Sequence, residues 1–406
     1  MAAMLSSYHQ RLKEQLKQLG DLPIPSVEAI VHSEKLHHFI QNKMLENGGF
    51  VNFQDFMELA LYAPGLGYYA AGAQKIGESG DFVTAPEISP LFSDCLAMQI
   101  AQVLGVIEHP QILELGAGQG TMAADILLRL EELDTLPQYY FILERSAELR
   151  ERQQHYLQKH IPHLFSKVQW LNELPQKGFK GAIVANEVID AMGVRLIESQ
   201  DGELFEKVVV SHEDKFFFEF KKADQDIEKW YQARQIAHDL PENYQTEVNF
   251  LQSVWMESLA DFLEEGIILL LDYGFPAAEY YHSQRSGTLM CHYRHHAHSD
   301  PLVLLGLQDI TAHVDFTSLA ETGFAKGLGV SGYIDQANFL TNCGLLERMT
   351  ELAGEKAEVM LRYSQQAKIL MLPTEMGEIF KVIAFTKNVS LPYLVGFQRG
   401  DRRGRL

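Results

Sequence analysis

The sequence has few cysteines, no long hydrophobic run and no excess of basic residues. Its three cysteines, Cys95, Cys291 and Cys343, lie far apart without a C-x-x-C pair, so we expect neither a disulfide framework nor a thiolate zinc site. The apolar run at residues 267–271 is far shorter than the roughly 20 residues that span a bilayer. The sequence therefore predicts a reducing compartment and no transmembrane helix.

Acidic residues outnumber basic residues. The 406-residue chain has 54 Asp and Glu against 34 Lys and Arg, a formal net charge of −20, which repels phosphate backbones and disfavours generic nucleic-acid binding. Its 46% hydrophobic and 22% charged residues are those of an ordinary globular protein. We expect the whole chain to fold, either as one large domain with additional segments or as two closely packed domains.

The N-terminal segment does not resemble a targeting signal. Residues 1–20 lack the apolar stretch of an export signal. Arg11, Lys13 and Lys17 would suit an amphipathic transit helix, but Glu14 is unusual in one. We therefore expect a cytoplasmic location in a bacterium rather than the mitochondrial matrix.

Strand and helix patterns alternate in the middle of the chain. The predicted strands are residues 111–115, 139–143, 167–171, 182–185 and 267–271, and the predicted helices between the first of them are 121–133 and 147–160. The last two strands are apolar on both faces, as in a parallel sheet covered by helices. This pattern predicts an α/β fold with a doubly wound sheet.

The flanking segments are less regular. Residues 31–62 have helical periodicity, with Asn52 as a candidate helix cap, and residues 62–89 are rich in Gly, Ala and Pro without periodicity. The remaining predictions are a hairpin at 205–210 and 216–220, then two helices, an irregular stretch at 272–311, a last strand at 380–386 and a frayed basic tail, QRGDRRGRL.

Three glycines follow the first predicted strand. Gly116, Gly118 and Gly120 would let the backbone turn sharply and approach a ligand closely, although close packing of the strand on its helix could also require them. Their G-x-G-x-G spacing differs from the dinucleotide pattern. Glu114 adds a fixed negative charge that would repel a pyrophosphate and favour a cationic, phosphate-free ligand such as S-adenosyl-L-methionine, which disfavours a dehydrogenase.

Further acids follow the second and fourth predicted strands. Glu144 comes 24 positions after Gly120, where this architecture holds ribose hydroxyls; the alternative is a surface ion pair with Arg145. Asn186, Glu187 and Asp190 would emerge at the carboxyl edge of the sheet. If the turn is helical, Glu187 and Asp190 share a face and could clamp a guanidinium; alternatively, Glu187 caps a following helix.

Six blocks of the sequence together resemble the MidA family of class I S-adenosyl-L-methionine-dependent methyltransferases. They are ESGDFVTAPEISPLF, ILELGAGQGTMAADIL, ILERSAELRERQ, NEVIDAMGVR, LDYGFPAAEYYHSQRSGTLMCHYRHHAH and QDITAHVDFTSLA. The similarity runs in order over roughly residues 30–386. It implies a Rossmann-like sheet with an N-terminal helical segment over the cofactor (1–90), a methyltransferase core (91–192 and 265–390), an inserted hairpin-plus-helices lid on the substrate side (193–264) and a basic tail (391–406).

The resemblance also implies roles for individual residues. Glu114, Gly116, Gly118 and Gly120 would line the methionine end of the cofactor and Glu144 its ribose, while Gly80, Asp81, Phe82 and Thr84 would fold over it. Asn186, Glu187 and Asp190 would face the methyl group. Where relatives often have proline, this chain has Met192 and then Gly193, which we expect to loosen the turn that places Asp190.

The implied activity is protein-arginine N-methylation with symmetric dimethylation. The cofactor would be S-adenosyl-L-methionine, and the substrate a protein with an accessible arginine, a respiratory complex I subunit or its bacterial equivalent, methylated by a chain that could form a homodimer. The alternatives are a small-molecule O- or N-methyltransferase and a non-catalytic assembly factor that binds the same cofactor.

Further candidate site residues lie nearer the C-terminus. Asp309, His313 and Asp315 could accept the proton that leaves the acceptor nitrogen. The alternative is a helix start capped by Asp309 or Thr311, with His313 packed beneath. HYRHHAH holds four histidines but no carboxylate motif at ligand spacing, so we expect a partly exposed loop and no metal site.

Overall fold

The computed structural model describes residues 7–20, 22–70, 83–175 and 178–406. The chain forms two compact units, the first from residues 1–82, 190–251 and 278–313 and the second from residues 83–189, 252–277 and 314–406. These boundaries lie elsewhere than those of the predicted domain ranges, and the N-terminal and inserted segments share one unit. Among the helices of the described residues, none has the combination of length and apolar character that a membrane span needs.

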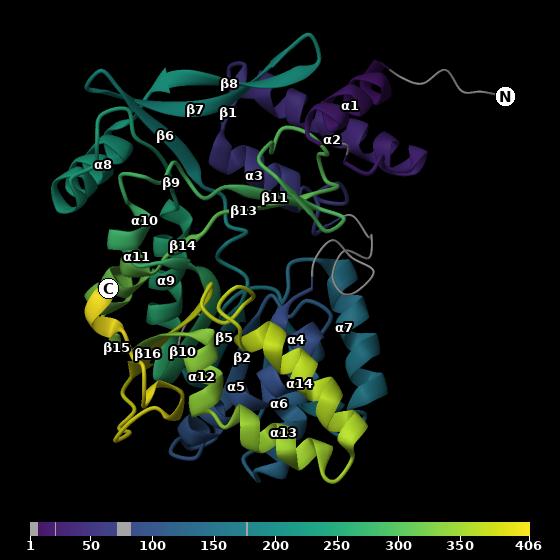
Figure 1. Cartoon of the computed structure of the whole chain (residues 1–406), viewed down its shortest axis with the longest axis vertical. Helices are drawn as coiled ribbons and strands as arrows, with labels where there is room; N and C mark the ends of the chain where they lie inside the picture. Colours follow the sequence, from purple (N-terminus) through teal and green to yellow (C-terminus); the bar gives the residue numbers. More distant parts are fainter. Residues whose placement is uncertain (1–6, 21, 71–82, 176–177) are drawn as a thin grey trace. The chain divides into compact units, whose positions relative to one another are not determined.

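An eight-stranded sheet forms the centre of the second unit (Figure 1). Its strands are β2 (Gln111–Leu115), β3 (Tyr140–Leu143), β4 (Val168–Leu171), β5 (Phe179–Asn186), β10 (Leu263–Phe275), β14 (Val314–Asp315), β15 (Gly329–Asp335) and β16 (Phe380–Lys387). The order is β15-β16-β10-β5-β2-β3-β4, with β14 paired to β10. From β10 to β4 the strands are parallel, and β16 is antiparallel to both of its neighbours. The predicted Rossmann-like α/β fold is confirmed.

Helices connect these strands and bury one continuous core. They are α4 (Ala85–Ile88), α5 (Pro90–Leu104), α6 (Thr121–Glu132), α7 (Ala147–His160), α9 (Phe250–Phe262), α11 (Phe316–Ala325), α12 (Gln336–Asn342), α13 (Leu345–Ala353) and α14 (Ala357–Met371). Ile112, Val184 and Leu269 from three adjacent strands are fully buried with side chains of α5 and α6. This core covers one face of the sheet, and Ile183, Ile268 and Leu270 are buried on the other face. Burial of apolar surface on both faces is the main force that holds the sheet together.

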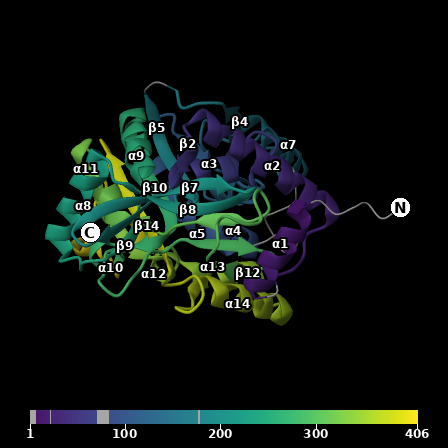
Figure 2. The same cartoon turned by 90° about the horizontal axis from the view of Figure 1, so that it is seen from above.

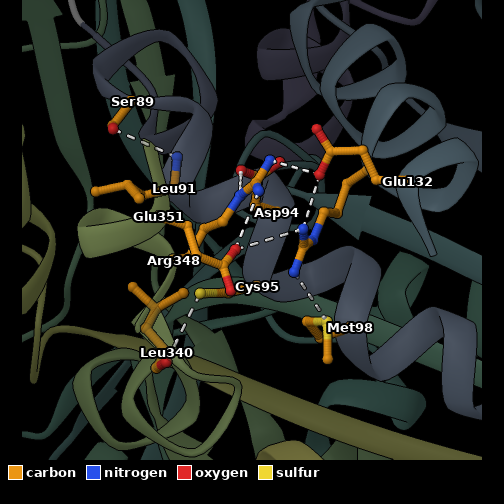
Figure 3. Close-up of polar contacts among 10 residues, drawn as sticks. Ser89, Leu91, Asp94, Cys95, Met98, Glu132, Leu340, Arg348 and Glu351 are labelled. Atoms are coloured by element: carbon orange, nitrogen blue, oxygen red, sulfur yellow. Dashed lines mark hydrogen bonds and ion pairs between the residues drawn. The ribbon is translucent and has the colours of Figure 1, made fainter. Parts of the chain in front are cut away.

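An ion-pair network joins α5, α6 and α13 (Figure 3). The guanidinium of Arg348 lies 2.7 Å from a carboxylate oxygen of Asp94, 2.9 Å from one of Glu132 and 3.2 Å from one of Glu351. Because Asp94 is buried, it depends on this arginine for its counter-charge. The network therefore stabilises the packing of α5, α6 and α13.

The basic C-terminal segment is docked on the second unit, so the prediction of a frayed tail is wrong. Arg402 donates its backbone N–H to the carbonyl of Tyr333 at 2.6 Å, and its guanidinium lies 2.9 Å from the buried carboxylate of Asp335. The short helical turns Val395–Phe397 and Arg403–Arg405 bring Phe397 against Phe339. Arg402 is therefore the partner of a buried acid, which composition alone did not indicate.

Among the described residues of the first unit, most belong to two antiparallel sheets and four helices. The larger sheet contains β1 (Phe50–Asn52), β6 (Arg195–Gln200), β7 (Glu203–His212), β8 (Lys215–Lys222) and β9 (Gln245–Val248), and the smaller one β11 (Met290–Tyr293), β12 (His296–His298) and β13 (Asp309–Thr311). The helices are α1 (Ser7–Gln18), α2 (Val27–Glu46), α3 (Phe53–Tyr62) and α8 (Gln225–His238), while α10 (Ala277–Tyr280) spans the boundary between the units. The predicted hairpin is β7–β8 (Figure 2).

Three local predictions concern the first unit: the cap at Asn52, the stretch 272–311 and the turn at Gly193. Asn52 caps α3, as predicted, by accepting the N–H of Asp55 at 2.7 Å. The stretch 272–311 is irregular only in part: it contains the end of β10, α10 and all three strands of the smaller sheet, whereas residues 281–289 and 299–308 form neither helix nor strand. Gly193 does not loosen its turn, because a Cβ there would lie 2.5 Å from the carbonyl oxygen of Gln54. Glycine is needed at this position for close backbone packing.

Candidate functional site

The carboxyl ends of three adjacent strands lie at one level. In the sheet register, Leu115 of β2 is paired with Leu143 of β3 and with Ala185 of β5. The residues that follow these three positions are Gly116, Glu144 and Asn186. The predicted glycine turn, second acid and acidic segment therefore begin side by side at the carboxyl edge of the second unit's sheet, where open α/β sheets bind ligands.

The turn between β2 and α6 depends on glycine. Gly116, Gly118 and Gly120 have φ angles of 68°, 52° and 91°, which L side chains rarely adopt. A Cβ at Gly116 would also lie 3.0 Å from Cγ2 of Val188. Backbone strain therefore accounts for these glycines whether or not a ligand binds, and exposure of Gly116 leaves its backbone accessible at the edge.

Glu114 is a buried carboxyl group beneath this turn. It is 1% exposed and accepts a hydrogen bond from the hydroxyl of Tyr140 at 2.8 Å. Burial raises the pKa of Glu114 to about 7; the Tyr140 hydrogen bond lowers it, and the charge of Glu144 raises it further. The expected fixed negative charge is therefore wrong for the ligand-free protein, in which both protonation states are populated near neutrality. A bound cation would favour the charged form.

Glu144 is held by donors from α7 and from its N-cap residue, Ser146. One carboxylate oxygen accepts the backbone N–H of Ser146 at 2.9 Å, and the other accepts Nε2 of Gln153 at 3.1 Å. Burial raises the pKa of Glu144, and these hydrogen bonds lower it. Gln153 also donates to the carbonyl of Gly118 at 3.0 Å. Glu114, the glycine turn and Glu144 are thus brought together, as the sequence predicted.

Of the residues expected to cover the cofactor, the structure describes Thr84. Gly80, Asp81 and Phe82 lie outside the described residues. Thr84 occupies the N-cap position of α4 without a side-chain cap hydrogen bond. One turn later, Glu87 accepts the hydroxyl of Thr121 at 2.7 Å, so α4 is tied to the first residue of α6, next to the glycine turn.

Asn186 and Glu187 end β5 in a strained turn. Glu187 has a φ of 52°, its N–H donates to the carbonyl of Leu271 at 2.9 Å, and Nδ2 of Asn186 donates to its carboxylate at 3.0 Å. A left-handed backbone at a non-glycine residue costs about 1–3 kcal/mol and is often found at functional sites. The predicted helical turn is wrong, and so is the alternative cap, because β6 and not a helix follows.

Asp272, which the sequence analysis did not single out, fixes this turn. It is fully buried on β10, and its carboxylate accepts the N–H of Ile189 at 2.9 Å and that of Tyr273 at 2.9 Å. Its position directly after the apolar run 267–271 was a usable signal, since that is the carboxyl end of a strand. Gln153 was also missed, and its place within a polar helix gave no signal.

Asp190 belongs to the first unit, because the chain leaves the second unit after Ile189. Its carbonyl accepts the N–H of Ala312 at 2.9 Å. The hydroxyl of Tyr69 donates to both carboxylate oxygens of Asp309, at 3.0 and 3.1 Å. Burial raises the pKa of Tyr69, and the charges of Asp309 and Asp190 raise it further. Asp190, Asp309 and Tyr69 therefore form one acidic cluster in the first unit.

The two remaining catalytic candidates, His313 and Asp315, belong to different units. His313, in the first unit, is half-buried and donates its backbone N–H to the hydroxyl of Thr288 at 2.9 Å. Asp315, in the second, caps α11 by accepting the N–H of Ser318 at 3.0 Å. The alternative caps, Asp309 and Thr311, are wrong, because both residues lie in β13.

The histidine-rich segment is a β-hairpin rather than the expected loop. β11 and β12 pair around Arg294 and His295, both of which have positive φ angles. In the described part of the chain, no group of three or more His, Cys, Asp and Glu side chains could hold a metal ion.

The edge of the second unit's sheet suits a phosphate-free, cationic nucleoside. A carboxylate can accept hydrogen bonds from ribose hydroxyls or from an ammonium group, whereas two neighbouring acids would repel a pyrophosphate. The charge of Glu144 raises the pKa of Glu114, and both acids lie at the same edge of adjacent strands, so one ligand could contact both. The residues present therefore fit S-adenosyl-L-methionine.

Comparisons with known proteins agree with this chemistry. A family model described as "Putative S-adenosyl-L-methionine-dependent methyltransferase" matches residues 95–334. A crystal structure from Burkholderia thailandensis, bound to S-adenosyl-homocysteine, is 41% identical and covers 95% of this chain and 100% of that chain, with a TM-score of 0.90. The protein arginine methyltransferase NDUFAF7, mitochondrial, of Mus musculus is 27% identical, over 84% of this chain and 82% of that protein. Its Drosophila melanogaster homolog is 26% identical, over 87% of this chain and 85% of that protein.

One expectation is overturned by these relatives. The sequence predicted a bacterial cytoplasmic location, but the similar curated proteins of Drosophila melanogaster, Mus musculus and Homo sapiens are named as mitochondrial. The acidic residue Glu14, which argued against a transit helix, was too weak a signal to decide location.

Proposed function

This chain belongs to the MidA family of class I S-adenosyl-L-methionine-dependent methyltransferases, and we propose that its acceptor is the guanidinium of a protein arginine. The enzyme class and the cofactor are those of the family. The arginine acceptor is the finer proposal, supported by the names of the curated relatives, which are 26–27% identical to this chain.

The cofactor would lie at the carboxyl edge of the second unit's sheet. When bound, S-adenosyl-L-methionine supplies an electrophilic methyl group on a sulfonium. We assign Glu114 to the ammonium of its methionine end, Glu144 to its ribose hydroxyls and the turn at Gly116 and Gly118 to close backbone approach. The raised pKa of Glu114 supports this assignment, because a buried carboxyl group gains most from a cationic ligand.

The position of Glu187 is the single observation on which we base an arginine acceptor. Its carboxylate is half-buried beside the cofactor edge, in a left-handed backbone conformation that places it at the end of β5. A guanidinium is a weak nucleophile because its lone pairs are delocalised. A carboxylate that binds its far nitrogens would hold the charge there and leave electron density on the nitrogen that is methylated.

The other candidates keep subordinate roles in this proposal. Asn186 orients the carboxylate of Glu187 through its Nδ2. Asp190 and His313 belong to the first unit and stay sequence-based predictions of a proton acceptor, whereas Asp315 is assigned to capping α11. Symmetric dimethylation, a respiratory complex I subunit as the acceptor and a homodimer rest on the family resemblance.

The test is a methyl-transfer assay with labelled S-adenosyl-L-methionine and protein extracts, followed by mass spectrometry of the labelled proteins. We expect mono- and symmetrically dimethylated arginine, and we expect Glu187→Gln to reduce labelling at least about 100-fold, because loss of one group that stabilises charge typically costs a factor of this order. Glu173→Gln, which changes an exposed carboxylate of the same unit, is the matched control and should keep full labelling.

Two results would contradict the proposal. Label confined to solvent-extractable metabolites would indicate a small-molecule methyltransferase. Full protein labelling by Glu187→Gln would remove Glu187 from the acceptor site.

A further inference from the structure

Gln153 of α7 joins three separate segments of the second unit. Its Nε2 donates to the carbonyl of Gly118 at 3.0 Å and to the carboxylate of Glu144 at 3.1 Å, and its Oε1 accepts the indole N–H of Trp170 at 2.9 Å. The side chain is fully buried. We infer that Gln153 is a positioning residue, which holds the glycine turn and the second acid in the geometry that binds the cofactor's ribose. This inference rests on the proposed cofactor assignment.

Only an amide fits this position. The carbonyl of Gly118 and the carboxylate of Glu144 are acceptors, so both require the NH₂ group, whereas the indole of Trp170 is a donor and requires the oxygen. The partners therefore fix the orientation of the amide, and both of its N–H groups are used. Glutamate has the same shape but would place an acceptor against two acceptors.

The bond to Glu144 has a specific consequence for the ligand. The backbone N–H of Ser146 holds one oxygen of this carboxylate and Gln153 holds the other. Each oxygen keeps lone pairs for further hydrogen bonds, but the carboxylate can no longer rotate. A carboxylate fixed in this way is pre-organised for two ribose hydroxyls, and pre-organisation lowers the entropic cost of binding.

The test measures binding of S-adenosylhomocysteine by calorimetry, which needs no acceptor. Hydrogen bonds to charged groups are strong, so we expect Gln153→Met to weaken binding roughly 10- to 100-fold. Trp170→Phe is the matched control: it removes the third hydrogen bond of Gln153 but leaves both bonds to the site, and should change affinity less than about threefold.

Two further measurements separate positioning from a merely structural role. For the 2′,3′-dideoxy analogue of S-adenosylhomocysteine, Gln153→Met should lose much less affinity, because the hydroxyls that Glu144 would hold are absent and only the bond to Gly118 still matters. Gln153→Glu should bind worse than wild type at pH 8 and recover part of the difference at pH 6, since protonation of the paired carboxyls restores a donor. This second variant keeps the test valid if Gln153→Met does not fold.

Equal affinity of wild type and a folded Gln153→Met for S-adenosylhomocysteine would overturn the inference. So would an equal loss for the dideoxy analogue, because Gln153 would then act on the fold as a whole. Failure of the proposed function gives a different result: binding would depend on Gln153 as expected, and no protein arginine would be methylated.

Discussion

Glu114 and Asp94 are both buried acids of the second unit, but their charges are balanced in different ways. Glu114 is 1% exposed and Asp94 is 5% exposed. Asp94 has the guanidinium of Arg348 at 2.7 Å, whereas Glu114 accepts the neutral hydroxyl of Tyr140 at 2.8 Å. Among the described residues, the groups that shift the pKa of Glu114 include another acid and no cation.

The difference separates a structural acid from a binding acid. Burial raises the pKa of both carboxyl groups, but for Asp94 the arginine opposes that rise. Between the helices the protein supplies its own counter-charge, so the pair is complete without a ligand. For Glu114, no described cation opposes the effect of burial on its pKa, and a cationic ligand would supply the counter-charge. A buried acid without an internal cation at the carboxyl edge of a parallel sheet is therefore the stronger indication of a ligand site.

The largest expected effect is on stability, from removing the counter-charge of Asp94. Arg348→Met should lower the free energy of unfolding by about 2–3 kcal/mol at pH 8, because Asp94 then remains buried without its hydrogen-bonded cation and only the charge of Arg129 still favours its ionised form. At pH 5 the loss should be smaller, since Asp94 can take up a proton. Urea unfolding at the two pH values measures both. The affinity for S-adenosylhomocysteine should not change; a loss of affinity would mean that the network of Figure 3 also shapes the binding site.

The second effect is on binding. Glu114→Gln keeps an oxygen for the hydroxyl of Tyr140 but removes the charge, so the affinity for S-adenosylhomocysteine should fall about 30-fold, equivalent to about 2 kcal/mol. Asp94→Asn is the matched control, because it neutralises an equally buried acid away from the edge, and it should leave affinity unchanged. If both variants bind like wild type, Glu114 does not contact the cationic end of the ligand.

The sheet and its carboxyl edge could be predicted because their signals are local. Strands that are covered on both faces must be apolar throughout, as at residues 182–185 and 267–271, and a ligand-binding acid must follow such a strand directly. Glu144 directly follows β3, and Glu114 lies one residue before the end of β2. Both acids are therefore at the carboxyl edge of the sheet.

The features that the sequence did not predict depend on contacts between residues far apart in the sequence. Gln153 is one polar residue among many on α7, and its partners are Gly118 and Trp170. The tail looked frayed because its acidic partner, Asp335, lies on β15. The turn after β5 looked helical because sequence spacing does not report the φ of Glu187. No local pattern encodes such contacts.

A third effect concerns pH. Burial raises the pKa of Glu114 from 4.5 to about 7, so between these values the folded protein keeps a proton that the unfolded chain has released. Stability of the ligand-free protein should therefore fall as pH rises from 5 to 7, by about 1–2 kcal/mol more in wild type than in Glu114→Gln. Asp125, whose pKa burial also raises to about 7, contributes equally to both proteins and cancels. Parallel pH profiles of the two proteins would show that Glu114 is already ionised without ligand.

The smallest expected effect comes from Ser146, whose backbone N–H holds Glu144 and whose side chain has a different role. Ser146 donates its backbone N–H to Glu144 at 2.9 Å, and its hydroxyl oxygen caps α7 by accepting the N–H of Leu149 at 3.3 Å. Ser146→Ala removes the cap alone, so the free energy of unfolding should fall by about 1 kcal/mol. Because the backbone N–H remains, the affinity for S-adenosylhomocysteine should stay within about twofold of wild type. A larger loss of affinity would show that the start of α7, and not its backbone N–H and Gln153 alone, sets the position of the second acid.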